Sequence, residues 1–227
     1  MKHFLFYTVL IFCGLNTQAQ INELGVFVGG TNYIGDIGPT DYIAPNEPSI
    51  GIVYKWNRSP RHAYRFSYTQ GKLTARDIDS DVPSRYLRGN SFENSVKEFS
   101  AGLEFSFMDF DLHDGDPKFS PYVYSGLSYF IYDEIYILDN NSREDYQSST
   151  FAIPMVLGLK ARLFQNFIIG AEVGFRYTFT DNLDGSNPKN DNFETLRFGN
   201  LNSNDWYVFT GLTLTYTFGK NPCFCTE

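Results

Sequence analysis

The sequence lacks any apolar segment after residue 19 that is long enough to form a transmembrane helix. Such a helix needs about 20 mostly apolar residues. A shorter apolar stretch covers residues 4–15 behind Lys2, and a small-residue sequence, Thr-Gln-Ala, ends at Ala19. This arrangement is typical of a cleaved signal peptide. We therefore predict a signal peptide over residues 1–19, and the rest of the chain excludes an all-helical membrane protein.

Cysteine is scarce, with three in the chain. Cys13 lies inside the signal peptide, and the bulky Phe12 before it argues against a lipid-attachment site. Cys223 and Cys225 remain, in a predicted periplasmic tail over residues 219–227. One residue separates them, so the pair is not the C-x-x-C motif of an oxidoreductase. Two interpretations stay open: a strained disulfide between the two cysteines, or a disulfide with a periplasmic partner.

Basic residues and tryptophan are also under-represented. The 18 Lys and Arg are outnumbered by 26 Asp and Glu, the formal net charge is −8, and the basic residues do not cluster. We therefore expect no nucleic-acid partner. Against 2 Trp there are 22 Phe, 16 Tyr and 19 Gly, a composition that suits strands carrying aromatic girdles. The mature length fits one domain.

Eight segments alternate between a bulky apolar face and a mixed face, which predicts β-strands. The last is the clearest: Trp206, Leu212 and Phe218 share the apolar face, and Asp205 and Thr213 lie on the other. Each segment has the length of a tilted membrane-crossing strand, roughly 9–14 residues. The segments are residues 23–33, 49–57, 62–73, 96–108, 121–132, 151–163, 167–180 and 205–218. They predict an all-β fold, an eight-stranded antiparallel outer-membrane β-barrel over residues 20–218.

The connections between these segments alternate in length. Residues 58–61, 109–120 and 164–166 form the shorter class, and residues 34–48, 74–95, 133–150 and 181–204 form the longer, polar class. Alternation places all the long connections at one end, as in bacterial outer-membrane barrels with periplasmic turns and extracellular loops. An even strand count then puts both termini in the periplasm. We expect the Arg- and Asp-containing part of the second long loop, residues 76–88, to be solvated.

The mixed faces carry charged residues that would be costly in lipid, at several kcal/mol each near the midplane. Inside a narrow barrel such groups can pair across the lumen, which eight strands leave just wide enough for side chains to fill. We therefore predict a closed, charge-filled lumen rather than a pore. The predicted network comprises Lys55, Arg65, Glu98, Glu104, Lys160, Arg162, Glu172 and Arg176.

A soluble barrel or sandwich is the alternative fold, because alternation does not say which face points inwards. The bulky face on nearly every segment, the loop asymmetry and the aromatic residue that ends the last strand favour the membrane barrel. A lipid-active enzyme is disfavoured, because His62 and His113, the histidines after the signal, lie next to or within the shorter connections, at the wrong end for outer-leaflet lipid. We expect no enzymatic activity, cofactor, metal or small-molecule substrate, and outer-membrane lipid as a partner.

Three segments resemble a known family. They are E-L-G-V-F-V-G-G-T-N-Y-I-G-D-I at residues 23–37, E-V-G-F-R-Y-T-F-T-D at residues 172–181 and Y-T-F-G-K-N-P-C-F-C at residues 216–225. Together they resemble the PorG-like outer-membrane barrels of the type IX secretion system of Bacteroidetes. The resemblance implies a structural role: association with the periplasmic ring of PorK and PorN, in support of protein export.

The leading hypothesis is thus a barrel that anchors a periplasmic ring to the outer membrane. The alternative is a general eight-stranded barrel for adhesion or membrane stability that acts through its extracellular loops. A narrow porin ranks third, because Arg and Glu are expected to fill the lumen.

Overall fold

The computed structural model describes residues 21–112, 118–164 and 166–219 of the chain. Eight antiparallel strands pair in sequence order, and β1 pairs with β8 to close a barrel. The predicted eight-stranded antiparallel barrel is therefore confirmed. No helix among these residues is long and apolar enough to cross a membrane. The signal peptide (1–19) and most of the tail (219–227) lie outside the described residues, as do His113, Cys223 and Cys225.

The element bounds agree with the predicted segments most closely at β2, β7 and β8. The strands are β1 (Ile21–Ile34), β2 (Glu47–Asn57), β3 (His62–Arg76), β4 (Ser91–Ser106), β5 (Phe119–Leu138), β6 (Asn141–Phe164), β7 (Phe167–Thr178) and β8 (Trp206–Phe218). Short helical segments occur in two of the longer connections: η1 (Asp77–Asp79) and α2 (Pro83–Arg88) between β3 and β4, and η2 (Asp191–Leu196) between β7 and β8.

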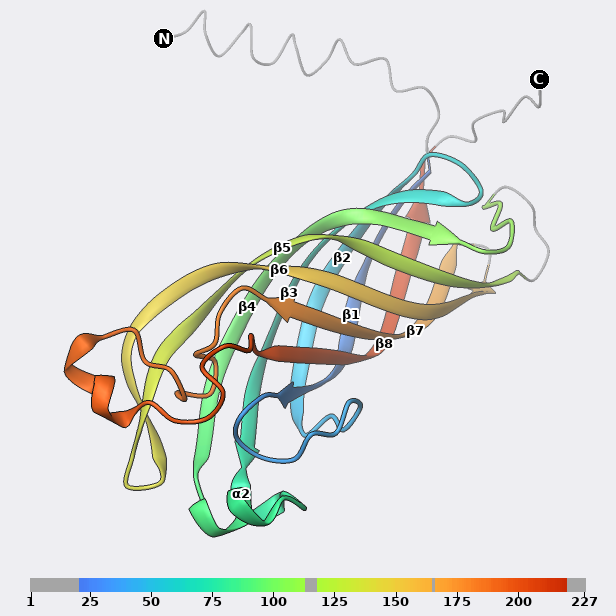
Figure 1. Cartoon of the computed structure of the whole chain (residues 1–227). Helices are drawn as coiled ribbons and strands as arrows, with labels where there is room; N and C mark the ends of the chain where they lie inside the picture. Colours follow the sequence, from blue (N-terminus) through green and yellow to red (C-terminus); the bar gives the residue numbers. More distant parts are fainter. Residues whose placement is uncertain (1–20, 113–117, 165, 220–227) are drawn as a thin grey trace, which may run out of the picture.

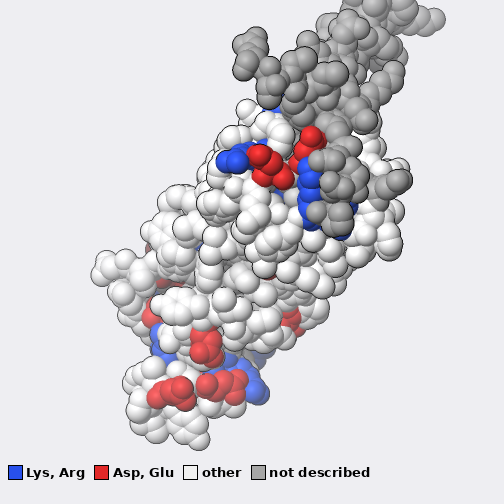
Figure 2. Space-filling view, turned by 90° about the vertical axis from the view of Figure 1, so that its right-hand side faces the viewer, with Lys and Arg blue, Asp and Glu red and all other residues white. Residues whose placement is uncertain are grey.

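The barrel wall has apolar side chains outside and polar ones inside. Leu24, Ile52 and Leu157 are 50%, 55% and 63% exposed, whereas the inward Glu98 and Glu104 are fully buried. Figure 2 shows the same division on one face: charged residues gather towards the two ends, and the surface between them is mostly uncharged. A water-soluble barrel would place these faces the other way round. Apolar residues outside and charged residues inside are the arrangement of a transmembrane β-barrel.

Aromatic residues on the outer wall form two rows of directly opposed cross-strand pairs. At the end with the shorter connections, Trp56 pairs with Tyr64 and Phe167 with Tyr216. At the other end the row passes through β3, β4, β5 and β6 as Tyr68, Phe99, Tyr129 and Phe151. Aromatic girdles at both edges of an apolar band are typical of membrane barrels. The two aromatic rows agree with a membrane barrel, but the apolar wall extends past the second row, where Ile50 and Val28 are exposed.

The connection predicted over residues 133–150 is not a loop. β5 and β6 continue as a paired hairpin to Leu138 and Asn141, beyond the apolar band. Asp139 and Asn140, both with positive φ (52° and 66°), form its two-residue turn, as the type I′ hairpin turn requires. Figure 1 shows this hairpin reaching past the barrel wall at the end where α2 lies. The sequence-based prediction missed it because strands outside the membrane need no continuous apolar outer face.

The first and last described strands meet at the end with the shorter connections, where Asn22 lies opposite Phe218. The longer connections lie at the opposite end (Figure 1). The predicted asymmetry of the two ends is therefore present. Which end faces the periplasm stays a prediction.

Candidate functional site

The lumen is spanned by side chains from opposite strands. Arg65 on β3 donates from Nη1 and Nη2 to Glu172 on β7 at 2.8 and 2.7 Å. In a ring of eight strands, β3 and β7 lie across from each other. Tyr122 on β5 donates its hydroxyl proton to the same carboxylate. Its ring lies over Gly158, where a Cβ would come within 2.3 Å of the ring, so this position needs glycine.

Glu104 on β4 is the centre of a second set of contacts. Lys55 on β2 lies 2.7 Å from one of its oxygens, and Lys160 on β6 lies 2.9 Å from the other. Arg65 is 3.7 Å away and links this set to Glu172. Both lysine ammonium groups also lie over the ring of Tyr122, at 5.1 and 5.6 Å from its centroid. A bound carboxylate and an aromatic face thus replace the water that each buried cation loses.

Glu98 forms a third set nearer the end with the longer connections. Arg176 on β7 lies 3.1 Å from its Oε2, and Tyr207 on β8 donates to the same oxygen at 2.6 Å. Glu98 is on β4, opposite β8 in the ring, so this contact also crosses the whole lumen. The Arg176 guanidinium lies 4.7 Å from the centroid of the Phe209 ring.

In the structure, every residue of the predicted network except Arg162 lies in the lumen contacts. The structure also adds one buried carboxylate, Glu23, that the prediction did not include. Arg162 lies at the barrel mouth, where its Nη2 donates to the carbonyl of Asp111 at 3.0 Å, and it is only partly buried. Glu23 on β1 is fully buried and accepts bonds from Asn57 at 2.9 Å and Thr215 at 2.9 Å. Glu23 was missed because it begins its strand, although alternation from Gly25 puts it on the inner face.

With Glu23, four buried carboxylates of the lumen face four buried cations: Glu23, Glu98, Glu104 and Glu172 against Lys55, Arg65, Lys160 and Arg176. A fifth buried carboxylate, Glu134, lies in the part of β5 beyond the apolar band and pairs with Lys189 of the β7–β8 connection at 2.6 Å. Buried ion pairs add little net stability, but removal of one partner leaves an uncompensated charge at high cost. The lumen is therefore a closed, charge-matched core.

The half of the barrel interior that lies towards the longer connections is mainly apolar, and these connections cover it. Phe27, Phe92, Phe130, Phe209 and Leu183 belong to one buried cluster that extends from the lumen into the connections. Phe130 lies edge-on to Tyr207, with the ring centroids 5.4 Å apart. The interior is thus layered, with ion pairs towards the shorter connections and aromatic packing towards the longer ones.

Buried aspartates hold the connections together as a cap. Asp205 accepts bonds from the Tyr33 hydroxyl and from the amide of Leu183 at 2.8 Å. Asp184 accepts from the amide of Ile37 at 3.1 Å. Burial raises the pKa of the Asp205 carboxyl well above its usual range, and the Asp184 charge adds to this. Burial likewise raises the pKa of Asp184, and that of Asp181 to about 6.

Most residues of the segment 76–88 are exposed, as expected of a solvated loop, but buried and half-buried side chains anchor it to the rest of the cap. Asp77 is fully buried and accepts from the amides of Gly38 and Asn90, both at 3.0 Å, and from Arg88 Nε at 2.6 Å. Arg85 donates to the carbonyls of Gly38 and Gly35 at 2.6 and 2.8 Å. The first two longer connections therefore form one folded unit.

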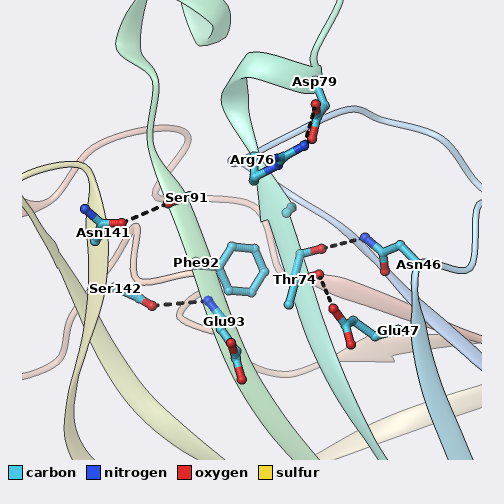
Figure 3. Close-up of a pocket in the computed structure, with 11 residues that line it drawn as sticks. Asn46, Glu47, Thr74, Arg76, Asp79, Ser91, Phe92, Glu93, Asn141 and Ser142 are labelled. Carbon is cyan, nitrogen blue, oxygen red and sulfur yellow. Dashed lines mark hydrogen bonds and ion pairs between the residues drawn. The ribbon is translucent and has the colours of Figure 1, made fainter.

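A polar hollow of about 590 Å³ lies at the rim of this end, between β2, β3, β4 and the β6 end of the hairpin (Figure 3). Asn46 donates to the Thr74 carbonyl at 3.0 Å, and the Ser142 hydroxyl accepts from the amide of Glu93 at 3.1 Å. Its lining contains neither His nor Cys. Within the described residues no group of His, Cys, Asp and Glu could hold a metal ion. His62 is the first residue of β3 and is exposed, with Nδ1 3.1 Å from the Ser59 hydroxyl.

A family model described as "Domain of unknown function (DUF6089)" matches residues 2–227. The chain therefore belongs to this family. No curated protein matches the chain.

Several solved barrels are similar to it at low identity. The attachment invasion locus protein Ail of Yersinia pestis is 11% identical over 88% of this chain and 99% of its own, with a TM-score of 0.44. The N-terminal β-barrel domain of Pseudomonas aeruginosa OprF is 15% identical over 88% and 100%, with a TM-score of 0.47. Neisserial surface protein A (NspA) is 12% identical over 88% and 96%, also at 0.47.

Proposed function

We propose that the protein is a structural component of the bacterial outer membrane, a closed eight-stranded barrel that holds other molecules in place and passes no solute. The observation that carries this proposal is the lumen. Direct contacts join opposite strands at Arg65–Glu172 and at Glu98–Tyr207. The apolar outer band supports the membrane location, because its exposed side chains would be unfavourable in water.

The finer proposal is that the barrel belongs to a type IX protein secretion system and anchors the periplasmic PorK/PorN ring. Its support is the resemblance of residues 23–37, 172–181 and 216–225 to PorG-like proteins. The position of β8 agrees with it. The strand ends at Phe218 beside the start of β1, at the end with the shorter connections, so the Cys223–Cys225 tail leaves from that end.

Two measurements test the anchoring role. In a deletion strain, export of cargo proteins should fail, and full-length protein should restore it. PorK and PorN should co-purify with the full-length protein and not with a chain that ends at residue 218. Non-reducing electrophoresis of membranes from the wild type and a Cys223→Ser/Cys225→Ser variant then shows whether the link is a disulfide. Intact export in the deletion strain would refute the anchoring role.

A second candidate function is adhesion or membrane support through the extracellular end. The folded cap favours it: Asp77, Asp184 and Asp205 fix the longer connections in one arrangement, and such loops serve for binding when a scaffold positions them. Replacement of residues 74–95 and 181–204 by short turns separates the two functions. The anchoring role predicts that export survives the replacement, and the adhesion role predicts that function is lost.

A further inference from the structure

Three hollows follow one another along the outer face of β3 and β4, from the apolar band to the rim of the cap. The first, about 540 Å³, is apolar and lies over Ala101, which is opposite the larger Phe66 on β3 and Leu127 on β5. The second, about 490 Å³, includes Lys72 and Lys97. The third is the polar hollow at the rim, about 590 Å³. The chemistry of the lining therefore changes in steps along one pair of strands.

The register of β3 and β4 fixes the order of these steps. Beyond Ala101, the outward residues pair in successive rows: Tyr68 with Phe99, Gln70 with Lys97, Lys72 with Ser95, Thr74 with Glu93, and Arg76 with Ser91. Because outward side chains recur every second residue, each row lies about 6.6 Å further along the strand. The apolar hollow ends at the aromatic row, and the polar hollow begins two rows beyond Lys97.

The second hollow combines apolar and basic lining. Val28 and Ile50 are exposed on its β1 and β2 side. Lys97 is exposed on β4, and none of the described residues forms an ion pair with it. Gln70, opposite Lys97, accepts the Tyr68 hydroxyl proton on Oε1 at 3.3 Å, which leaves its amide nitrogen as a donor. An unpaired cation and an amide donor beside apolar side chains suit the phosphate group of a lipid.

The third hollow has hydrogen-bonding groups and an excess of negative charge. Its lining carries the carboxylates of Glu47, Asp79 and Glu93 and one cation, Arg76, which Asp79 holds at 2.9 and 3.1 Å. The Thr74 hydroxyl donates to Oε1 of Glu47 at 3.3 Å, and Oε2 of Glu47 has no donor among the described residues (Figure 3). Such a lining repels phosphate, whereas carboxylates, amides and hydroxyls together bind the hydroxyl groups of a sugar.

We propose that this face of β3 and β4 binds lipopolysaccharide, the phosphorylated glycolipid of the outer leaflet in Gram-negative outer membranes. An acyl chain would lie in the hollow over Ala101, a phosphate of the lipid A part would contact Lys97 and Gln70, and core sugars would occupy the polar hollow. Lipopolysaccharide presents these groups in this order from the bilayer outwards. A phospholipid has no sugar for the third hollow, and a soluble glycan has no acyl chain for the first.

The inference rests on the proposed outer-membrane location, with the longer connections outside. The test is native mass spectrometry of the purified full-length mature protein, so its outcome does not depend on conductance or on protein export. Four lipids are added in equal amounts: rough lipopolysaccharide, the lipid A part of it, the same lipid A without its phosphates, and phosphatidylglycerol. Rough lipopolysaccharide should be the most abundant adduct, and lipid A should bind better than its dephosphorylated form.

Each hollow has a variant that changes one of these comparisons. Lys97→Gln should lower the ratio of lipid A to dephosphorylated lipid A about fivefold, the effect of one ion pair near the upper end of those at surfaces. Glu47→Ala should lower the ratio of rough lipopolysaccharide to lipid A about fivefold, the effect of one hydrogen bond. Thr74→Phe, which places a ring in the polar hollow, should lower the same ratio. Ala101→Leu, which fills the apolar hollow, should reduce adducts of all four lipids.

The chain offers matched controls. A further apolar hollow on the wall, lined by residues that include Leu157, Ala171 and Leu212, has no Lys or Arg in its lining, so Ala171→Leu should leave both ratios unchanged. Arg143→Gln removes an exposed cation of the hairpin and should also have no effect. Electrophoresis of unheated samples confirms that each variant is folded.

Two results would overturn the proposal. Phosphatidylglycerol adducts as abundant as those of rough lipopolysaccharide in the wild type would assign the wall to lipids in general and Lys97 to a snorkelling role. A preference for rough lipopolysaccharide that survives Lys97→Gln, Glu47→Ala and Thr74→Phe would place its binding elsewhere on the barrel.

Discussion

Arg65 and Glu172 form a two-point contact, at 2.8 and 2.7 Å, between strands on opposite sides of the barrel. Two parallel N–H···O bonds fix the orientation of both side chains as well as their separation. The pair thus spans the lumen as a crosspiece. Glu104, 3.7 Å from the same guanidinium, ties it to Lys55 and Lys160.

The first prediction concerns this crosspiece. Glu172→Gln leaves the Arg65 guanidinium in the closed lumen with only Glu104 nearby. Loss of one partner of a buried pair costs about 3–5 kcal/mol. We expect the free energy of unfolding to fall towards that range, as measured by urea unfolding of the barrel in lipid vesicles.

The double variant Arg65→Gln/Glu172→Gln is the control, because it removes both charges together. It should recover most of the loss, since the penalty comes from the unpaired charge and not from the missing bond. Equal destabilisation in the single and double variants would show that the pair acts by packing alone.

The sequence predicts the faces of the strands well, because alternation reports directly which side chains share a face. Seven of the eight residues in the predicted network are buried in the lumen, whereas Arg162 lies at the mouth of the barrel. The same alternation also places Glu23 on the inner face of β1. The partners across the lumen could not be predicted, since the residues that meet there depend on the register between the strands and on how far each side chain reaches.

The longer connections were the least predictable part. The β5–β6 hairpin beyond the band satisfies its backbone by pairing, so its sequence needs no apolar outer face. Asp77, Asp184 and Asp205 are common loop residues, and only the folded structure shows that they accept bonds from buried amides. The polar composition of these connections therefore indicated solvent exposure for carboxylates that the folded cap buries.

The second prediction compares two exposed leucines. Leu157 on β6 is 63% exposed in the middle of the apolar band, and Leu87 on α2 is 84% exposed on the cap. Leu157→Arg should cost about 2–4 kcal/mol of unfolding free energy in bilayers, the cost of Arg near the midplane. Leu87→Arg, in contact with water, should change it by less than about 0.5 kcal/mol. Equal effects would contradict the membrane position of the band.

The third prediction is the pH dependence of the cap. The pKa values of Asp184 and Asp205 are raised by burial, and that of Asp181 is raised to about 6. The folded cap therefore binds more protons than the unfolded chain, in which Asp has a pKa of about 3.9. Stability then falls as the pH rises from about 4 through these raised values. Amides of residues 179–205 should be better protected from hydrogen exchange at pH 5.5 than at pH 7.5, after correction for intrinsic rates.

Asp205→Asn is the matched variant for this prediction. It removes a titrating group, keeps an acceptor for the Leu183 amide, and supplies a side-chain N–H that can donate to the Tyr33 hydroxyl oxygen in place of the bond that this hydroxyl donates to Asp205. The pH dependence of protection should become weaker in this variant, while the amides of β1 and β8 in the apolar band stay unchanged. Stronger protection at pH 7.5 than at pH 5.5 in the wild type would reverse the predicted sign.

The most direct test of a closed structural barrel is the conductance of the mature protein in a planar lipid bilayer. The crossing contacts Arg65–Glu172 and Glu98–Tyr207 predict no resolved conductance steps. A double variant with Arg65→Ala and Glu172→Ala, which removes one crosspiece, serves to show whether steps can be detected when the lumen is widened. Reproducible single-channel steps from the wild-type barrel would contradict the closed lumen and favour a narrow porin.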